Sequence, residues 1–386
     1  MNEEIMQCAR IKAAFAPLEL ATIPIPACPD EGLLLQTICA GICHSDLHIV
    51  DDEVDVGNGN VFRHRDPLGA DYVGLIPGHE ICGQIVEIGS TVPSQCHLRP
   101  RDIVVLYPWR GCANCEACRE GESQLCENNA HGTTDIGQGK NGGGYGGYVA
   151  VPEWTLAIRL PKNLPPKIGC MLPCSGLTAF SAIQKVRPAL DLAIRIRGFA
   201  NLLVVGVGGL GMWTVVLVKS VYGDKNVKVL CADTEEDKLK TSTKLGADDA
   251  LCWSREATVE ELVDQTTMSG YNLQDAAIDF VGLPKTANTA MKSLNKGGCL
   301  ALVGLHGGEL AVSLPELISR SISLAGVRVA PLATLRNLVE LISVTEPEVY
   351  PPTEVVKLSE VNDVLDRMRK QTLKGRAIIQ HRATEQ

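Results

Sequence analysis

Four cysteines share one loop and have the spacing of a metal site. They follow the pattern C-x2-C-x2-C-x7-C at Cys112, Cys115, Cys118 and Cys126. Four thiolates in so short a segment can surround one tetrahedral ion, and the short spacers make most pairings too tight for a relaxed disulfide. Because four protein ligands leave the ion no open position, the pattern predicts a structural zinc ion. Glutamates between the cysteines disfavour the alternative of a zinc module that binds nucleic acid.

A second set of metal-binding side chains is scattered along the chain. Cys43 lies in Gly-Ile-Cys-His-Ser-Asp, His79 in Gly-His-Glu and Cys174 in Pro-Cys-Ser-Gly. Each of them alone is more typical of a structural residue. Together, two thiolates and one imidazole neutralise Zn²⁺ and leave a fourth position for water or substrate, which is the arrangement of a catalytic zinc ion. Asp46 is a candidate acceptor that would orient the imidazole of the metal ligand.

A glycine-rich turn predicts a dinucleotide site. The segment Gly-Val-Gly-Gly-Leu-Gly at 206–211 has the spacing G-x-G-x-x-G, after an apolar strand and before an apolar helix. The glycines allow a tight turn, a close approach of pyrophosphate to the backbone, and close packing of helix and strand. Asp233, 22 positions beyond the last glycine, is placed to bind the ribose hydroxyls of the adenosine. A carboxylate repels a 2′-phosphate, so the sequence favours NAD over NADP.

The elements that must position these residues fall into two blocks. Up to about residue 150, short apolar runs separated by Gly, Pro and Asp predict a β-rich domain with strands at 33–38, 81–88 and 102–106. Beyond Pro173, apolar strand-like runs alternate with helical stretches, which is the pattern of parallel βαβ units. The strands are expected at 202–205, 227–232, 276–280 and 299–303, and the helices at 210–222 and 235–245. After about Gly326 the chain turns helical again.

The composition excludes several classes of protein. The chain has 386 residues and a formal net charge of −9, and without a basic run it is a poor candidate for binding nucleic acid or an anionic membrane. No apolar stretch reaches the ~18 residues of a membrane span, and the first residues lack the apolar core of a secretory signal. Fifteen cysteines are an odd number, so complete disulfide pairing is impossible. We therefore expect a cytoplasmic protein in which some thiols are metal ligands.

Taken together, these motifs resemble those of the zinc-dependent medium-chain alcohol dehydrogenases. The run Cys-His-Ser-Asp at 43–46, Gly-His-Glu at 78–80, the cysteine quartet, Cys174 and the glycine turn occur in the order of that family, and the resemblance runs from about Lys12 to Ile379. It implies an α/β protein with two domains. A β-rich GroES-like catalytic domain would be formed by 1–177 and 327–386, and a Rossmann NAD-binding domain, with a doubly wound parallel sheet, by 178–326. The active site is expected in the cleft between them.

The resemblance implies an enzyme that transfers hydride between a primary or secondary alcohol and NAD, reversibly giving an aldehyde or ketone. It also implies two zinc ions per chain, the catalytic one held by Cys43, His79 and Cys174, and a homodimer or homotetramer. Cys174 points to the alcohol dehydrogenase branch, because polyol dehydrogenases generally have a carboxylate there. Two alternatives stay open. One is an NADP-using reductase of a specialised or conjugated carbonyl, and the other is a catalytically silent structural relative that binds NAD and zinc.

The resemblance also implies roles for neighbouring residues. Ser45 and His48 match the proton relay of the family, and Glu80 matches a carboxylate that approaches the zinc ion from behind and eases ligand exchange. Trp109 resembles an aromatic residue that lines the substrate pocket, with simple core packing as its alternative. The positions that match cofactor contacts are His44, Thr178, Gly206, Gly208, Gly209, Leu210, Gly211, Asp233, Lys238, Val303, Gly304 and Arg376.

One segment departs from the family pattern. Cys43 and His79 are 36 positions apart, more than is common between these ligands in the family, and the excess lies between Asp51 and Ile76. Long loops of this kind are often functional. The segment either reshapes the cleft entrance or an interface, or it is a solvated surface loop. The substrate class stays open because the cleft walls come partly from this segment.

Overall fold

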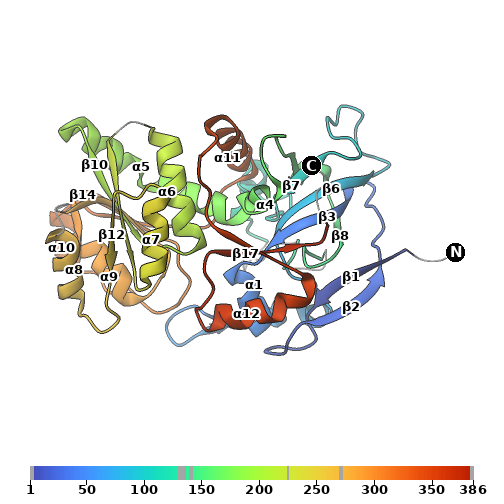
Figure 1. Cartoon of the computed structure of the whole chain (residues 1–386), viewed down its shortest axis with the longest axis horizontal. Helices are drawn as coiled ribbons and strands as arrows, with labels where there is room; N and C mark the ends of the chain where they lie inside the picture. Colours follow the sequence, from blue (N-terminus) through green and yellow to red (C-terminus); the bar gives the residue numbers. More distant parts are fainter. Residues whose placement is uncertain (1–3, 129–135, 139–141, 224–225, 269–272, 383–386) are drawn as a thin grey trace.

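The structure, a computed structural model, describes residues 4–128, 136–138, 142–223, 226–268 and 273–382. These residues form two lobes that lie side by side, each built around its own large β-sheet (Figure 1). The middle of the chain forms the lobe with a parallel sheet. The N-terminal part and the returning C-terminal part together form the β-rich lobe.

A six-stranded, wholly parallel sheet forms the middle-chain lobe, in the order β12-β11-β10-β13-β14-β15. Its central strand β10 (Ala200–Val205) is buried along its whole length, as expected of a strand that is covered on both faces. The predicted strands are present, although β14 begins at Leu294, before its predicted start. The other strands are β11 (Val227–Asp233), β12 (Asp249–Cys252), β13 (Gln274–Asp279), β14 (Leu294–Leu302) and β15 (Ser323–Gly326).

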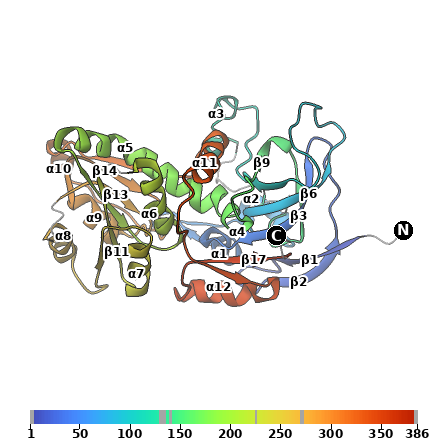
Figure 2. The same ribbon diagram turned by 45° about the horizontal axis from the view of Figure 1, so that its top comes forward.

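Helices cover both faces of this sheet because successive residues of a strand point to opposite sides. Val204 of β10 belongs to one apolar cluster with Trp213 of α6, whereas Val205 belongs to another with Met291 of α9. Figure 2 shows the two layers of helices on either side of the strands. The helices of this lobe are α5 (Leu177–Arg197), α6 (Gly209–Tyr222), α7 (Glu236–Lys244), α8 (Val259–Met268), α9 (Pro284–Lys292) and α10 (Leu314–Ser319).

The β-rich lobe is built on a sheet to which both ends of the chain contribute. Its order is β16-β17-β3-β6-β7-β9, and β8 also pairs with β3. β17, close to the C-terminus, runs antiparallel to β3, with Ile379 opposite Ala40. The strands are β3 (Leu33–Gly41), β6 (Glu80–Ile88), β7 (Ile103–Leu106), β8 (Tyr148–Val151), β9 (Ala157–Arg159), β16 (Thr353–Val356) and β17 (Arg376–Gln380). The predicted β-rich architecture is therefore confirmed, and the returning segment completes it.

Smaller elements surround these two sheets. Two hairpins pair β1 (Ile5–Arg10) with β2 (Glu19–Pro24), and β4 (Val54–Asp55) with β5 (Val61–Phe62). The remaining helices are α1 (His44–Asp51), α2 (Arg65–Leu68), α3 (Glu116–Arg119), α4 (Pro166–Gly169), α11 (Leu332–Thr345) and α12 (Val361–Arg369). Shorter helical turns lie at Gly69–Tyr72, Ser123–Leu125, Trp154–Leu156, Leu172–Gly176 and Leu358–Glu360. No helix in the described parts of the chain combines the length and apolar character that crossing a bilayer requires.

A continuous apolar core joins the two lobes. Leu35 and Ile85 of the β-rich sheet belong to the same buried cluster as Leu172 and Leu177, at the junction between the lobes, and Trp213 of α6. Because apolar side chains are buried on both sides of the junction, the hydrophobic effect favours one fixed arrangement of the lobes. The elements that surround the cleft between them are held by this core.

Gly211→Ala is expected to destabilise the fold, whereas Gly208→Ala is not. A Cβ atom at Gly211 would lie 2.2 Å from the carbonyl oxygen of Gly206, so the turn into α6 could not close without shifting. The Cβ position of Gly208 has no heavy atom within 4 Å. Overpacking of this kind costs about 1–3 kcal/mol, which urea unfolding of the two variants measures. Equal stability of the variants would contradict the close packing at Gly211.

Candidate active site

The two lobes face each other across a cleft of about 2110 Å³. The residues predicted to take part in catalysis or to bind the cofactor or substrate line this cleft. Asp46 and Glu80 are the two exceptions, because both are fully buried next to the three candidate metal ligands. Side chains as distant in sequence as Cys43 and Arg376 meet here. The fold therefore brings the two predicted half-sites, one for a metal and one for a dinucleotide, into one space.

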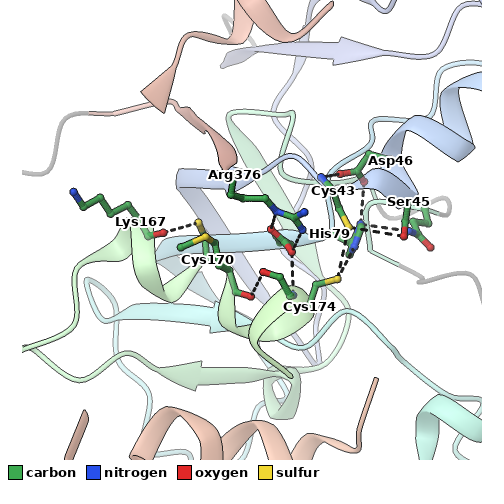
Figure 3. A network of polar contacts seen from close by, with 12 residues as sticks. Cys43, Ser45, Asp46, His79, Lys167, Cys170, Cys174 and Arg376 are labelled. Carbon is green, nitrogen blue, oxygen red and sulfur yellow. Dashed lines mark hydrogen bonds and ion pairs between the residues drawn. The ribbon is translucent and has the colours of Figure 1, made fainter. Parts of the chain in front are cut away.

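Cys43, His79 and Cys174 converge on one point of the cleft (Figure 3). The two sulfur atoms are 3.9 Å apart, and Nε2 of His79 is 3.2 Å from Sγ of Cys174. A tetrahedral zinc ion with Zn–S distances of about 2.3 Å places its sulfur ligands about 3.8 Å from each other. The donor atoms thus have the chemistry and the spacing of a zinc site. Among the described residues, no fourth thiol, imidazole or carboxylate belongs to this group.

Each of the three side chains comes from the end of an element. Cys43 precedes α1 directly, His79 precedes β6, and Cys174 lies in the turn Leu172–Gly176 before α5. That turn has the wide hydrogen bonding of a π-helix, a form that is frequent at functional sites. A hydrogen bond from the Cys174 thiol, assisted by the guanidinium of Arg376, holds the pKa of Cys43 well below its usual range despite burial. The thiolate is the form that binds a metal ion.

Asp46 is the acceptor that organises this site. Its carboxylate is fully buried and accepts the backbone N–H of Cys43 at 2.8 Å, while its other oxygen is 2.9 Å from Nδ1 of His79. Burial opposes a charge on His79, but the neighbouring carboxylate raises the pKa of the imidazole well above its usual value. With the proton held on Nδ1, Nε2 of His79 faces the two sulfur atoms.

Tyr145 is a third partner of Asp46 that sequence reasoning missed. Its hydroxyl donates to Oδ2 of Asp46 at 3.2 Å, and its ring is completely buried. The ring packs so closely on Gly78 that a Cβ atom there would lie 2.5 Å from it. The signal in the sequence is a single aromatic residue within the glycine run 142–147. Gly78, on which the ring packs, directly precedes the histidine ligand. Only the folded chain brings these segments together.

Glu80 and Arg376 form a buried ion pair, and Figure 3 shows Arg376 near the three candidate ligands. Nε of Arg376 donates to Glu80 at 3.0 Å, a second guanidinium nitrogen bonds to the other carboxylate oxygen, and the N–H of Ser175 donates to the same carboxylate at 3.1 Å. Gly41 makes room, because a Cβ atom there would lie 2.0 Å from Glu80. The resemblance implied separate roles for these two residues, whereas the structure pairs them. Arg376 also lies 3.6 Å from the Cβ position of Gly209.

The dinucleotide half of the cleft begins at the end of β10. Gly206 has a φ of +83°, a conformation that favours glycine, and leads into the turn before α6. Asp233, at the end of β11, accepts the N–H of Val207 at 2.9 Å and that of Glu235 at 3.0 Å. Its carboxylate is thereby fixed beside the glycine turn, with acceptor capacity left for hydroxyl groups. The turn lies where the strand order reverses, which is where dinucleotides bind in such sheets.

Ser45 and His48 lie on α1, close to the metal-binding group. Oγ of Ser45 is 3.8 Å from Sγ of Cys43, and Nδ1 of His48 is 3.3 Å from the carbonyl oxygen of Glu53. Burial lowers the pKa of His48 below its usual value. The imidazole is therefore neutral around neutral pH and able to accept a proton.

The cysteine quartet closes around a second point, outside the cleft. Its four sulfur atoms lie within 4.8 Å of one another, and those of Cys115 and Cys126 are 4.0 Å apart. Hydrogen bonds from Asn128, Asn114 and Cys115 lower the pKa of Cys112 to about 6. All fifteen cysteines are free thiols. Four converging thiols without a disulfide have the donor set of a structural zinc ion.

Trp109 connects the quartet loop to the cleft. Its ring lies edge-on to that of His79, with 5.8 Å between the ring centroids, and lines the cleft. The long segment between Asp51 and Ile76 also reaches the cleft, through Val54, Val61, Phe62 and His64. The interpretation that this segment reshapes the cleft entrance is therefore favoured over a purely solvated loop.

Two family models match the chain. Residues 29–162 match the alcohol dehydrogenase GroES-like domain, and residues 209–344 match the zinc-binding dehydrogenase family. The solved alcohol dehydrogenase of Aeropyrum pernix has a TM-score of 0.78 and 29% identity, with 97% of this chain and 99% of that chain covered. Its fold is thus the fold described above.

Curated relatives match over nearly their whole length. The alcohol dehydrogenase of Geobacillus stearothermophilus is 27% identical, with 97% of this chain and 98% of that protein covered. The NAD-dependent alcohol dehydrogenase of Sulfolobus acidocaldarius is 31% identical over 367 residues, which make up 94% of this chain and 96% of that protein. With both family models matched, a relative 31% identical over nearly the whole chain and two side-chain groups that could each hold a metal ion, the chain belongs to the zinc-dependent medium-chain alcohol dehydrogenases.

Proposed function

We propose that this chain is an NAD-dependent alcohol dehydrogenase, which transfers hydride reversibly between a primary or secondary alcohol and NAD and gives an aldehyde or ketone. The observation that carries the proposal is one cleft lined both by three converging metal-binding side chains and by a glycine turn with Asp233 beside it. Relatives named NAD-dependent alcohol dehydrogenases support it. The carboxylate of Asp233 disfavours an NADP-using reductase. A catalytically silent relative is disfavoured because the chain has all of the predicted catalytic and metal-ligating residues.

Cys43, His79 and Cys174 are assigned to a catalytic zinc ion, and the quartet to a structural one. When bound, the catalytic ion supplies Lewis-acid polarisation of the substrate oxygen, and NAD accepts the hydride. Asp46 holds the imidazole of His79 in the tautomer and orientation that a ligand needs. Trp109 packs against that imidazole and narrows the space for the substrate.

Ser45 and His48 are assigned to proton removal. The hydroxyl of Ser45 stands close to Sγ of Cys43 and can accept the proton of an alcohol bound there while it releases its own proton towards His48. His48 lies three residues further along α1 and lines the same cleft, so it can pass the proton to solvent. Its lowered pKa keeps it in the accepting form at neutral pH. Glu80, which is paired with Arg376, tunes the electrostatic field behind the ligands.

The cofactor contacts follow the two ends of the dinucleotide. The carboxylate of Asp233 fits the ribose hydroxyls of the adenosine and repels a 2′-phosphate, which favours NAD. Arg376, held by Glu80 beside Gly209, fits the pyrophosphate. The remaining proposed contacts are His44, Gly206, Gly208, Leu210 and Gly211 for the pyrophosphate, Lys238 for the ribose, and Thr178, Val303 and Gly304 for the nicotinamide.

The organisation around the site belongs to the same proposal. Residues 1–177 with 327–386 form the catalytic domain, because the strands of both segments share one sheet, and residues 178–326 form the Rossmann domain. We assign the enzyme to the cytoplasm, where thiols stay reduced. A homodimer or homotetramer is the proposed assembly, and the partner molecules are small alcohols, aldehydes or ketones.

Cys43→Ala and Cys174→Ala are expected to abolish alcohol oxidation and to remove one of two zinc ions per chain. Loss of a Lewis acid that contributes several kcal/mol lowers turnover by about 1000-fold. Elemental analysis gives the zinc content, and turnover is measured with primary, secondary and aromatic alcohols and with NAD or NADP. Cys8→Ala, at a buried thiol outside both groups, is the control. Full turnover by a variant that keeps one ion would contradict the assignment.

Cys115→Ser is expected to remove the other zinc ion and to destabilise the protein while the cleft keeps its ion. The quartet loop has few buried side chains of its own, so the metal ion contributes much of its stability. We expect the unfolding temperature to fall by about 5 °C or more, measured by differential scanning fluorimetry. Cys252→Ser, at an exposed cysteine, is the control. An unchanged zinc content would show that the quartet holds no ion.

His48→Gln is expected to slow alcohol oxidation most just above the lowered pKa of His48 and least at high pH. The pKa of His48 lies below its usual value, so the wild-type imidazole accepts protons at neutral pH and loses this capacity as the pH falls through that pKa. Glutamine cannot accept the proton, and the loss should reach about 10-fold or more near pH 6.5 and shrink towards pH 10, where hydroxide takes over. His97→Gln, outside the cleft, is the control. Identical pH–rate profiles would exclude His48 from the relay.

A further inference from the structure

The hairpin β4–β5, which we call the cleft hairpin (residues 54–62), is anchored at its base to the helix that carries Ser45 and His48. Asp52, fully buried at the end of α1, accepts the N–H of Arg65 at 2.8 Å and pairs with its guanidinium at 3.0 Å. Arg63 pairs with Glu53 at 2.7 Å. These contacts join the residues that follow the hairpin to those that precede it, at the end of α1. The hairpin is therefore attached next to the helix that carries Ser45 and His48.

The tip of the cleft hairpin contacts the opposite lobe. The N–H of Asn58 donates to Oε1 of Glu309, in the loop that follows β14 of the parallel sheet. In the same loop, a Cβ atom at Gly307 would lie 2.7 Å from the side chain of Asp55, so backbone and side chain are in direct contact. Asp55 in turn accepts the N–H of Gly57 at 2.8 Å, which shapes the tip. The hairpin therefore bridges the two lobes at the cleft.

The inner side of the cleft hairpin is apolar. Val54, Val61 and Phe62 line the cleft, and the ring of Phe62 is supported edge-on by His64 at 5.1 Å between centroids. Trp109, beside the metal-binding His79, also lines this space. An apolar group of a substrate would displace water from these side chains, whereas extra hydroxyl groups would lose hydrogen bonds there.

We propose that the cleft hairpin is the specificity-determining wall of the substrate site, which selects alcohols with a bulky apolar group, aromatic or branched, over ethanol and polyols. Phe62 makes the selective contact. Glu309 is a positioning residue, because it holds the hairpin from the other lobe and touches neither substrate nor metal ligands. The inference rests on the proposed function, since it concerns the substrate of that same site.

Phe62→Ala tests the selective contact. The ratio of kcat/KM for benzyl alcohol to that for ethanol is expected to fall about 10- to 100-fold, the range for apolar contacts in a pocket. Phe62→Leu keeps most of the apolar surface. It should therefore recover at least half of the loss in this ratio, when the ratio is expressed as its logarithm. Asn60→Ala, on the same hairpin but outside the cleft, is the control. Equal losses for both alcohols would overturn the proposal.

Glu309→Ala tests the positioning of the hairpin. KM for benzyl alcohol is expected to rise about 5- to 10-fold, the usual net effect of one hydrogen bond, with kcat unchanged. Glu309→Gln keeps an acceptor oxygen and should restore KM. Amide hydrogen exchange of residues 54–62 should become faster in Glu309→Ala and return to the wild-type rate in Glu309→Gln. Exchange that is identical in all three proteins would overturn the bridging contact.

A binding measurement separates this inference from the proposed function. Dissociation constants for benzyl alcohol and ethanol, followed by intrinsic tryptophan fluorescence, report on the wall without turnover. Tighter binding of benzyl alcohol that is lost in Phe62→Ala supports the wall, and equal ratios in wild type and variant overturn it. Absence of turnover with any alcohol would overturn the proposed function, while the binding ratio and the hydrogen exchange would still decide the role of the hairpin.

Discussion

The site depends on one buried carboxylate. Asp46 has no exposed surface, and it binds the backbone of Cys43, the imidazole of His79 and the hydroxyl of Tyr145. A buried carboxylate is costly unless its acceptor positions are filled, so these three partners stabilise the charge and are themselves fixed by it. Three chain segments are thereby tied together at the point where a metal ion needs its ligands oriented. The precision of the metal site follows from the need to satisfy this charge.

A second buried charge connects the metal half of the cleft to the dinucleotide half. Glu80 starts β6 and Arg376 starts β17, so their ion pair links the N-terminal part of the chain to the returning C-terminal segment. Breaking a buried pair by removal of one partner typically costs about 3–5 kcal/mol. Arg376 also adjoins Gly209 of the glycine turn, and after the hydrogen bond from Cys174 it is a further cause of the lowered pKa of Cys43. The guanidinium of Arg376 thus contributes to both the metal half and the dinucleotide half of the cleft. The site is complete only when the N-terminal part of the chain and the returning C-terminal segment have folded together.

The chemistry of the site could be predicted from short segments of the sequence. The short spacing identifies the quartet, because four thiols within one short loop are close enough along the chain to bind the same ion. The glycine turn and Asp233 are likewise local, since a strand, a turn, a helix and the next strand form one compact unit. Apolar runs and turn residues predict the parallel and the β-rich block. The observed start of β14 differs from the predicted one because pairing with neighbouring strands, not residue propensity, sets where a strand begins and ends.

How distant residues meet could be seen only in the folded chain. Cys43, His79 and Cys174 lie far apart in the sequence, and nothing in their local sequences shows that their side chains meet. The glycines around Tyr145 mark this residue as unusual but do not identify Asp46 as its partner. The pairing of Glu80 with Arg376 needs β17 to join the N-terminal sheet, and the contact of Asn58 with Glu309 needs the two lobes to close on each other. Spacing in sequence constrains only neighbours within a turn or a supersecondary unit. Contacts between remote segments depend on how the apolar core packs the sheets, which the order of residues does not reveal directly.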